Sequence, residues 1–433
     1  MSNVTPVSIP EMEAVSEEQE KKIASFVSSN VKNGSPPPPP WIGTLNDTDL
    51  RILGYKFLVA RKWNPVEAAK MLQGTIEHRK REKTDESLYF PPAFTIRGYD
   101  FNELNRFFNK PTREPTENVD KIFKCIAPYY TGTFHKWDKM GHPVMIELFG
   151  ATNVRKLVEQ FKGLAPPGQS YIKPACDAHV HFNEVGVRLV KYNDATLGPA
   201  LGRRVLGVTA ILDVQGLGYG HLWKPVLEVV RHTWAMDSSF YPEGLHRLFV
   251  VNCPSMIMFA YNIVKGWLDP RIQSKIRFCK PGAATIEALT SVIDVENLPE
   301  FLGGKCHCEG GCIHRPDAPD PSDSSAQEDH MTEEVTIYSG KKLTREFNVL
   351  PGTEVTWEWA TSTKEVMFSV SMFADGSAGE RIVVDPIKCG EGSDVFKSEE
   401  KGKAVLIWDN SFSWMTSKTL NMRVLKVDAQ DGS

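Results

Sequence analysis

From Asn46 to about residue 90, hydrophobic positions recur at helical spacing. Pro65 suits the first position of a second helix, and the charged run His78–Arg81 suits its end. This pattern predicts two antiparallel helices joined near Trp63. The apolar stripes of the two helices consist of Leu50, Leu53, Phe57 and Leu58, and of Ala68, Ala69, Leu72 and Ile76.

From residue 119 to 314 short apolar runs alternate with helical patterns. This alternation predicts an α/β domain with a mostly parallel sheet, flanked by helices through right-handed crossovers. The expected strands are 144–148, 205–214, 248–251 and 274–278, and the expected helices lie near 152–162, 177–191, 222–235, 255–264 and 285–292.

The helix expected at 255–264 is unusually apolar for its surroundings. An ordinary buried helix of an α/β domain would have this composition, and so would a helix that covers an apolar ligand. Its neighbours Gly266 and Asp269-Pro270 mark its end and offer a hinge. The apolar residues of this segment are Met256, Ile257, Phe259, Ala260, Tyr261, Ile263, Val264 and Trp267.

The remaining segments have other patterns. Residues 1–45 form an extension in which Ser16 and Gln19 fit a capping box, before a polyproline spacer at Pro36–Pro40. Residues 315–331 are rich in Pro, Asp and Ser and read as a linker. From 332 to 428 apolar residues alternate with period two between turn residues, which predicts an antiparallel all-β sandwich.

Composition narrows the class of protein. The chain has 433 residues, 41% of them hydrophobic, and a net charge of −4, so bulk attraction to nucleic acid is not expected. The N-terminus lacks an apolar signal core, and no apolar run has the ~18–20 residues of a bilayer span. Eight scattered cysteines fit reduced thiols, so we expect a cytoplasmic protein whose membrane contact is peripheral.

Motifs for catalysis are weak. Gly216–Gly220 reads G-x-G-x-G rather than G-x-G-x-x-G, and it lies deep in the chain, so a nucleotide loop is not expected. The sequence has no G-x-S-x-G and no H-E-x-x-H motif, so we expect no enzyme activity and no cofactor.

One group of residues has the chemistry of a metal site. Cys306, Cys308, Cys312 and His314 form C-x-C-x₃-C-x-H, and thiolates with imidazole suit zinc. The spacing differs from the usual C-x₂-C knuckle, so our expectation is no metal, with this group as the alternative.

The amino-acid sequence of the α/β region resembles the CRAL-TRIO (Sec-fourteen-like) family of lipid-exchange proteins. The resemblance rests on the segment around Ala60–Trp63, on the turn Asp138–Gly141 with the strand after it, on 240–276, and on the ending at 296–304. It implies a helical N-terminal subdomain at 46–90 and a lipid-binding domain at 119–314. In that family the helix at 255–264 is the gate over an apolar lipid cavity.

The C-terminal region resembles the GOLD (Golgi dynamics) domain. The match lies in the run from Leu406 to Val424, which includes Trp408-Asp409-Asn410. A CRAL-TRIO domain followed by GOLD is the arrangement of patellins and tocopherol-associated proteins, so a protein partner for the GOLD domain is implied.

The resemblance also implies ligand residues. Family members that carry phosphatidylinositol hold its headgroup at positions filled here by Arg61, Lys62, Glu243 and Lys275. Basic side chains pair with phosphate oxygens, and a carboxylate accepts hydrogen bonds from inositol hydroxyls. A hydroxyl pair that holds phosphatidylcholine in the family is replaced by Val208 and Ala210, which donate no hydrogen bond, so a different hydrophobic second ligand is expected.

We therefore expect a phosphatidylinositol-binding and transfer protein, with the bound phospholipid as cargo. It would act on Golgi, endosomal or plasma membranes, in vesicle trafficking or phosphoinositide signalling. Two alternatives fit the same features. One is a carrier of a neutral isoprenoid such as tocopherol. The other is a trafficking scaffold that acts through the GOLD domain and whose pocket only stabilises the fold.

Overall fold

The computed structural model divides into two compact units. The first unit is Met1–Leu217, Pro225–Pro254 and Asp269–Asp320, and the second is Gly218–Lys224, Ser255–Leu268 and Pro321–Ser433. The structure describes residues 15–32, 34, 37–84, 96–108, 117–254, 257–314, 333–361, 365–376 and 379–428. The expected linker at 315–331 lies outside these ranges.

The N-terminal helices of the first unit begin where their capping residues predict. Ser16 and Gln19 form the predicted capping box of α1 (Glu17–Val27). Asn46 caps α3 (Asp47–Ala60), and Asn64 caps α4 (Pro65–Glu82) with Pro65 at its first position. The predicted helix pair is confirmed, and α1 joins it in one hydrophobic core. Two short helices connect them, η1 (Ser28–Lys32) and α2 (Pro40–Gly43), so the last proline of the predicted spacer is helical.

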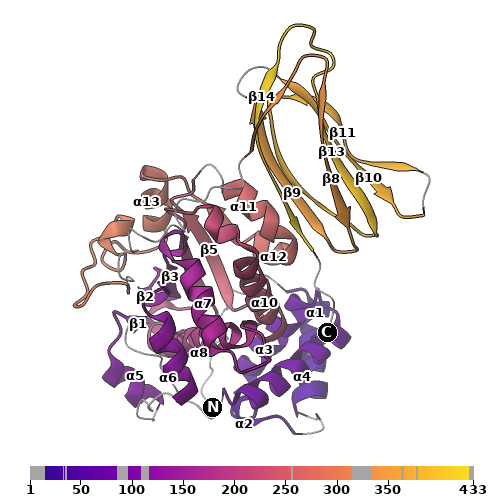
Figure 1. Ribbon diagram of the computed structural model, residues 1–433. Coiled ribbons are helices and arrows are strands. Elements are labelled where there is room, and N and C mark those ends of the chain that lie inside the picture. The colour runs from indigo at the N-terminus through magenta and orange to yellow at the C-terminus, as the bar shows by residue number, and fades with distance from the viewer. Residues whose placement is uncertain are drawn as a thin grey trace. The chain divides into compact units, whose positions relative to one another are not determined.

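A six-stranded sheet forms the centre of the first unit (Figure 1). The strands are hydrogen-bonded in chain order, and all neighbours are parallel except β2 and β3. The predicted mostly parallel sheet is confirmed. Its strands are β1 (Ile96–Arg97), β2 (Thr133–Trp137), β3 (Pro143–Glu147), β4 (Val208–Asp213), β5 (Leu245–Val251) and β6 (Ile276–Phe278).

The predicted crossover helices are present, with shifted ends. The helix expected at 177–191 spans Ile172–Thr196, because Pro174 lies in its first turn, where its missing N–H is tolerated. The segment after Asp269, expected to end a helix, begins a short one of its own. The helices are α5 (Phe101–Phe108), α6 (Glu117–Ile126), α7 (Val154–Leu164), α8 (Ile172–Thr196), α9 (Gly198–Leu201), α10 (Lys224–Phe240), α12 (Pro270–Gln273) and α13 (Ala283–Thr290), with 3-10 turns η3 (Phe149–Ala151), η4 (Tyr219–Leu222) and η6 (Glu300–Leu302).

The two faces of the sheet differ in burial. On one face Val144, Ile211 and Phe249 are buried in a core that includes residues of α13. On the opposite face several apolar side chains of the central strands are only partly buried. Strand pairing aligns Met145, Ala210 and Leu248 on that face. Val208 and Leu212 share the face with them, because strand side chains alternate.

A buried ion pair joins the N-terminal helices to the sheet region. Arg79 on α4 donates to Glu184 on α8, at 2.8 and 3.3 Å. Tyr241, in the turn before β5, donates its hydroxyl to the same carboxylate at 3.0 Å. Removing one partner of a buried ion pair costs about 3–5 kcal/mol, so these contacts fix α4 against α8 and the turn.

The hairpin between β2 and β3 is fixed by a buried carboxylate. Asp138 accepts hydrogen bonds from the backbone N–H groups of Met140 and His142 and from the hydroxyl of Thr209. The ring of His142 stacks on His246 at 3.8 Å between centroids. These contacts explain why the turn predicted at Asp138–Gly141 is tight, and they use Thr209 on the fully buried face of β4.

The C-terminal part of the second unit is the predicted all-β sandwich. Two four-stranded sheets, with orders β11-β10-β13-β8 and β12-β9-β14-β7, enclose a core that contains Trp357, Trp359 and Trp408. The pairs are antiparallel. The strands are β7 (Glu333–Ile337), β8 (Lys342–Val349), β9 (Glu354–Thr361), β10 (Val366–Ala374), β11 (Glu380–Cys389), β12 (Glu391–Lys397), β13 (Gly402–Asp409) and β14 (Lys418–Val427).

The run that resembles GOLD, Leu406–Val424, spans the end of β13, the loop after it and part of β14. Asn410 is fully buried and donates to the backbone carbonyls of Ile337, Tyr338 and Thr416, so it fixes the loop from within. Trp414 and Met415 in the same loop are 92% and 94% exposed. The sandwich architecture is confirmed, and the GOLD assignment stays a prediction.

Candidate functional site

Three charged residues of the first unit meet beside the start of β5. Lys275 donates to Glu243 at 2.9 Å, and Arg271 donates to the other carboxylate oxygen at 2.7 Å. Lys275 also donates to the carbonyl of Leu245 at 2.6 Å. The structure thus brings together two of the four residues expected to bind a headgroup, Glu243 and Lys275, whose side chains are 13% and 16% exposed. We call Glu243, Arg271 and Lys275 the charged cluster.

The charged cluster keeps its carboxylate ionised. Burial alone would raise the pKa of Glu243, but the hydrogen bond from Arg271 and the charge of Lys275 outweigh it and lower that pKa. With two cations to one carboxylate, the cluster has a net positive charge. It is therefore a place where an anionic group gains charge-assisted hydrogen bonds.

Arg61 and Lys62 lie in the turn after α3. Arg61 donates to the carbonyl of Ser238 at 3.0 Å, in the last turn of α10, just before the turn that holds Glu243. Lys62 is exposed, while the neighbouring Trp63 packs on the N-terminal core. The structure therefore joins Arg61 to the element that precedes Glu243, but shows no direct contact of Arg61 or Lys62 with the charged cluster.

Two of the expected headgroup residues have a strained backbone. The φ angles of Lys62 and Glu243 are +51° and +52°, in the left-handed region. This region costs a side-chain-bearing residue about 1–2 kcal/mol, so glycine or asparagine would be the ordinary choice there. Side chains that persist under such strain are frequent at functional sites.

The expected second-ligand residues lie on the partly exposed face of the sheet. Val208 and Ala210 both point to this face, and Val208 packs beside residues of α8. The hydroxyl between them, on Thr209, points to the opposite face and donates to Asp138. Neither position therefore offers a hydrogen-bond donor to a ligand on the partly exposed face.

A titratable residue that the sequence did not single out shares this face. Glu147 ends β3, and burial raises its pKa to about 7, with a smaller opposing effect from the charge of His179. His179 and Asn183 on α8 both contact Asp237 on α10, at 2.7 and 2.6 Å. The period of hydrophobic positions in the sequence indicates neither of these two contacts, because each joins side chains from separate helices.

The expected gate helix is α11 (Ile257–Val264), followed by the 3-10 turn η5 (Lys265–Trp267). Both belong to the second unit, where α11 packs on strands β9 and β12. Ser255 and Met256 lie outside the described residues. Of the expected gate residues, Phe259, Ala260 and Ile263 are buried, whereas Ile257, Tyr261, Val264 and Trp267 are partly exposed.

Polar contacts fasten the C-terminal half of α11 and the following turn to the sandwich. Asn262 donates to the hydroxyl of Ser393 at 3.1 Å, and the indole N–H of Trp267 donates to Glu354, also at 3.1 Å. Lys265 pairs with Asp394 at 3.3 Å. No pattern in the sequence indicates these partners.

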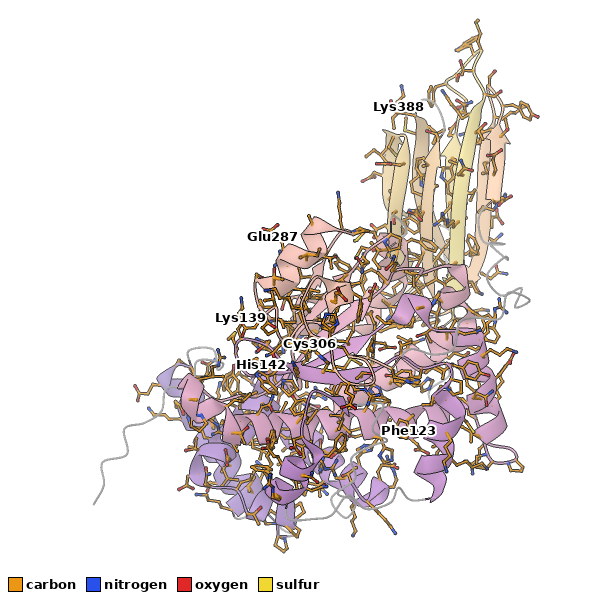
Figure 2. All side chains as sticks on the ribbon, turned by 90° about the vertical axis from the view of Figure 1, so that its left-hand side faces the viewer. Phe123, Lys139, His142, Glu287, Cys306 and Lys388 are labelled. Carbon is orange, nitrogen blue, oxygen red and sulfur yellow. The ribbon has the colours of Figure 1, made fainter. Side chains whose placement is uncertain are left out.

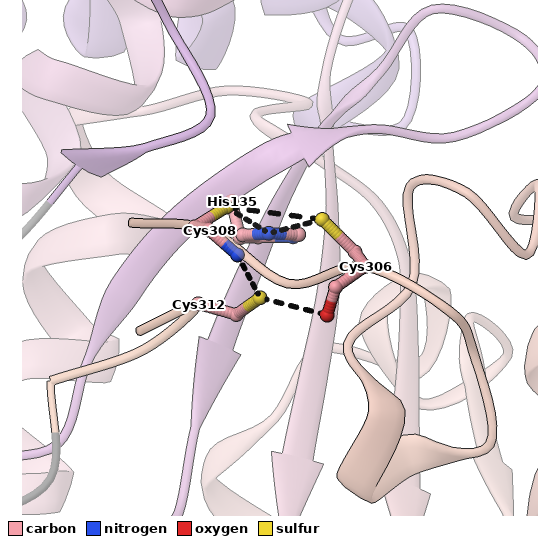
Figure 3. Close-up of side chains that lie close together, drawn as sticks. All are labelled: His135, Cys306, Cys308 and Cys312. Carbon is pink, nitrogen blue, oxygen red and sulfur yellow. Dashed lines mark hydrogen bonds between the residues drawn. The ribbon is translucent and has the colours of Figure 1, made fainter. Parts of the chain in front are cut away.

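The cysteines at the end of the α/β region lie together, with a different histidine from the expected one (Figure 3). The ring nitrogen Nε2 of His135, on β2, lies 3.3 Å from Cys308 Sγ and 3.6 Å from Cys306 Sγ. His314 lies apart, with its ring 2.7 Å from the carbonyl of Ala127. His314, the last member of the alternative set C-x-C-x₃-C-x-H, is therefore not part of this group.

Burial also sets the protonation of this group. Burial and the neighbouring thiols of Cys306 and Cys312 raise the pKa of Cys308 to about 12, so it is a thiol and not a nucleophile at neutral pH. Burial lowers the pKa of His135 to about 4. The imidazole is therefore neutral.

Comparison with known proteins identifies the α/β region. Residues 127–304 match the model of the CRAL/TRIO domain, so the chain contains a CRAL/TRIO domain with the mostly parallel sheet described above. The phosphatidylinositol/phosphatidylcholine transfer protein SFH11 of Arabidopsis thaliana is 33% identical over 196 residues, which cover 45% of this chain and 48% of the relative. The protein SFH4 of the same plant, named for the same transfer activity, is 30% identical over 266 residues, or 61% of this chain and 37% of the relative.

The chain spans less than half of the length of these curated relatives. Among solved structures, the crystal structure of Sfh5 aligns with 64% of this chain and 85% of its own, at 14% identity and a TM-score of 0.41.

In the described part of the chain, no helix has the length and apolar character needed to cross a membrane.

The charged cluster predicts a pH dependence of stability. A carboxylate with a lowered pKa contributes stability that is complete above its ordinary pKa of about 4.3 and is lost as the pH falls through the lowered value. Glu243→Gln should therefore lower the free energy of unfolding at pH 7 by about 1.5–3 kcal/mol, and this deficit should shrink as the pH falls below about 4. Urea unfolding of the full chain at pH 7 and at pH 3 measures both values.

Glu17→Gln is the matched control, because Glu17 pairs with Lys21 at the surface of α1. It should leave stability nearly unchanged at both pH values. A Glu243→Gln deficit of the same size at pH 3 as at pH 7 would contradict the role of the carboxylate charge.

Proposed function

We propose that this protein binds phosphatidylinositol and exchanges it between membranes, without covalent chemistry. The observation that carries the proposal is the combination, within one unit, of an apolar but incompletely buried sheet face and the charged cluster at the start of β5. A glycerophospholipid requires both kinds of surface, one for its acyl chains and one for its phosphate.

The partly exposed sheet face suits acyl chains. Met145, Val208, Ala210, Leu212 and Leu248 belong to central strands, where apolar side chains are normally buried completely. Each additional buried CH₂ group would contribute about 0.8 kcal/mol, so acyl chains against this face gain a large share of their binding energy from it. A bound lipid would complete the burial that the opposite face already has.

The charged cluster suits an inositol phosphate. The carboxylate of Glu243 accepts hydrogen bonds from Arg271 and Lys275, and a carboxylate has about four acceptor sites, so it suits an inositol hydroxyl as well. Lys275 and Arg271 both supply positive charge for a phosphate. Arg61 and Lys62 would complete the headgroup site from the turn after α3. Two named transfer proteins among the relatives support a phospholipid as the ligand.

The helix α11 would act as the gate. To move, α11 would have to break its contacts with β9 and β12 and form others. Gly266, in the turn after it, would form the hinge. On opening, Tyr261 and Trp267 would reach the bilayer interface, where aromatic side chains are favoured. The protein would then act in the cytoplasm and bind Golgi, endosomal or plasma membranes transiently.

The first prediction concerns the headgroup. Lys275→Glu removes a phosphate partner and places a second carboxylate beside Glu243, at a cost of about 1.5–3 kcal/mol. Transfer of phosphatidylinositol between vesicles should therefore slow about 10- to 100-fold. Lys70→Glu, a charge reversal at the exposed surface of α4, should transfer at the wild-type rate. Wild-type transfer by a folded Lys275→Glu variant would show that the cluster does not hold the headgroup.

The next prediction concerns the second lipid. Because Val208 and Ala210 provide no donor, a buried choline-lipid phosphate would lose about 1–3 kcal/mol per missing bond. Phosphatidylinositol transfer should far exceed phosphatidylcholine transfer, and Val208→Ser with Ala210→Thr should raise the latter about tenfold or more. Leu212→Thr adds a hydroxyl elsewhere on the same face and should not. Equal wild-type transfer of both lipids would overturn this assignment.

The last prediction concerns the gate. The Asn262 amide and the Ser393 hydroxyl are 3.1 Å apart, so Asn262→Cys with Ser393→Cys should form a disulfide between α11 and β12. Oxidation should stop lipid exchange, and a reductant should restore it. Asn262→Cys alone, oxidised in the same way, controls for the native cysteines. Exchange that continues at full rate in the crosslinked protein would mean that lipid leaves without movement of α11 from the sandwich.

A further inference from the structure

Four side chains with the chemistry of a zinc site converge at the end of the CRAL/TRIO domain. They are His135 from β2 and Cys306, Cys308 and Cys312 from the segment after η6, and their ligand atoms all lie within 4.8 Å of one another. His135 and Cys306 are buried. Figure 3 shows the imidazole between the thiols of Cys306 and Cys308, with Cys312 directly beneath. Figure 2 labels Cys306 on the ribbon of this unit.

The distances among His135, Cys306 and Cys308 suit three corners of a tetrahedral site. Zinc–sulfur bonds of about 2.3 Å place two thiolates about 3.8 Å apart in a tetrahedron, and a zinc–nitrogen bond of about 2.0 Å places nitrogen and sulfur about 3.5 Å apart. The Sγ atoms of Cys306 and Cys308 are 3.8 Å apart, and Nε2 of His135 is 3.6 and 3.3 Å from them. Three thiols and one imidazole form the Cys₃His set typical of closed structural zinc sites.

The backbone brings Cys312 back to this group. Gly310 and Gly311 have φ angles of +71° and +91°, which only glycine adopts readily, and Gly311 donates to the carbonyl of Cys308 at 2.9 Å. The backbone N–H of Cys308 points at the sulfur of Cys312 at 3.3 Å. An N–H directed at sulfur stabilises a thiolate. Cys312 also donates as a thiol to the carbonyl of Cys306 at 3.1 Å, a bond that metal binding would replace.

A disulfide explains the group less well. The Sγ atoms of Cys306 and Cys308 are 3.8 Å apart, against about 2.05 Å in a disulfide, and a bond between two of the three sulfurs would leave the third thiol and His135 without a role. The presence of the imidazole favours a metal, because neutral imidazole is a ligand for zinc.

We propose that His135, Cys306, Cys308 and Cys312 bind one Zn²⁺ ion in a structural site. The ion would fasten the segment that ends the domain to β2. The same segment is already held there weakly, because the backbone N–H of His314 donates to the hydroxyl of Thr133 at 3.3 Å. With all four positions filled by protein ligands, the site has no open position for catalysis.

Zinc content of the purified full-length protein tests the proposal, measured by inductively coupled plasma mass spectrometry after exhaustive dialysis. We expect about one zinc per chain in the wild type and less than about a tenth of that in His135→Ala and Cys306→Ser. His314→Ala, Cys125→Ser and Cys389→Ser are matched controls and should retain the metal. Co²⁺ substitution should give the absorption of a tetrahedral thiolate site.

Comparison of the His135→Ala and His314→Ala variants makes the test decisive. Zinc lost in His314→Ala and kept in His135→Ala would overturn the assignment of ligands, and a wild type that binds neither Zn²⁺ nor Co²⁺ would overturn the site. If the His135→Ala chain fails to fold, Co²⁺ titration of chelator-treated wild type still decides, because the site requires about one bound ion per chain. Mass spectrometry that finds a disulfide between two of the three cysteines in freshly purified protein would also contradict zinc binding.

Discussion

The unequal burial of the two faces of the six-stranded sheet is the constraint on which the account depends. One face is closed by a core that includes Phe249 and residues of α13, while the other exposes part of Val208, Ala210 and Leu212 on a central strand. Covering apolar surface in that position with an apolar ligand is favourable, because it removes the surface from water. The rest of the first unit holds this sheet in place. The Asp138 turn ties the β2–β3 hairpin to β4, and the Arg79–Glu184 pair fixes the N-terminal helices to α8.

Charge is arranged around this apolar surface in a consistent way. Glu184, which is buried, is paired with Arg79, and the partly exposed Asp237 is paired with His179. In the charged cluster two cations, Arg271 and Lys275, share the carboxylate of Glu243. A protein that carries an anionic lipid needs positive charge as well as an apolar surface. The backbone of Glu243 is strained, which indicates that glutamate does not occupy this position because of its backbone preference.

Much of the fold could be predicted from the sequence, because its signals are local. The spacing of hydrophobic positions and the capping residues predict the N-terminal helices. The patterns of hydrophobic positions along the chain predict the mostly parallel sheet and the all-β sandwich. Contacts between distant residues have no such signal. Arg271 follows a proline and reads as a surface charge, yet it pairs with Glu243. Spacing selected His314 for the cysteine group, whereas the fold supplies His135 from β2. The packing of α11 on the sandwich was likewise invisible, because apolar composition shows that a helix is covered but not by what.

The central claim is that the partly exposed sheet face and the charged cluster hold one phospholipid. Organic extraction of the purified full-length protein, followed by mass spectrometry of the extract, tests it directly. The account predicts phosphatidylinositol as the principal lipid, in clear excess over phosphatidylcholine. An extract with a neutral isoprenoid in its place would show that the charges of the cluster are structural. An extract without lipid, from protein that also fails to take up phosphatidylinositol from vesicles, would contradict the claim.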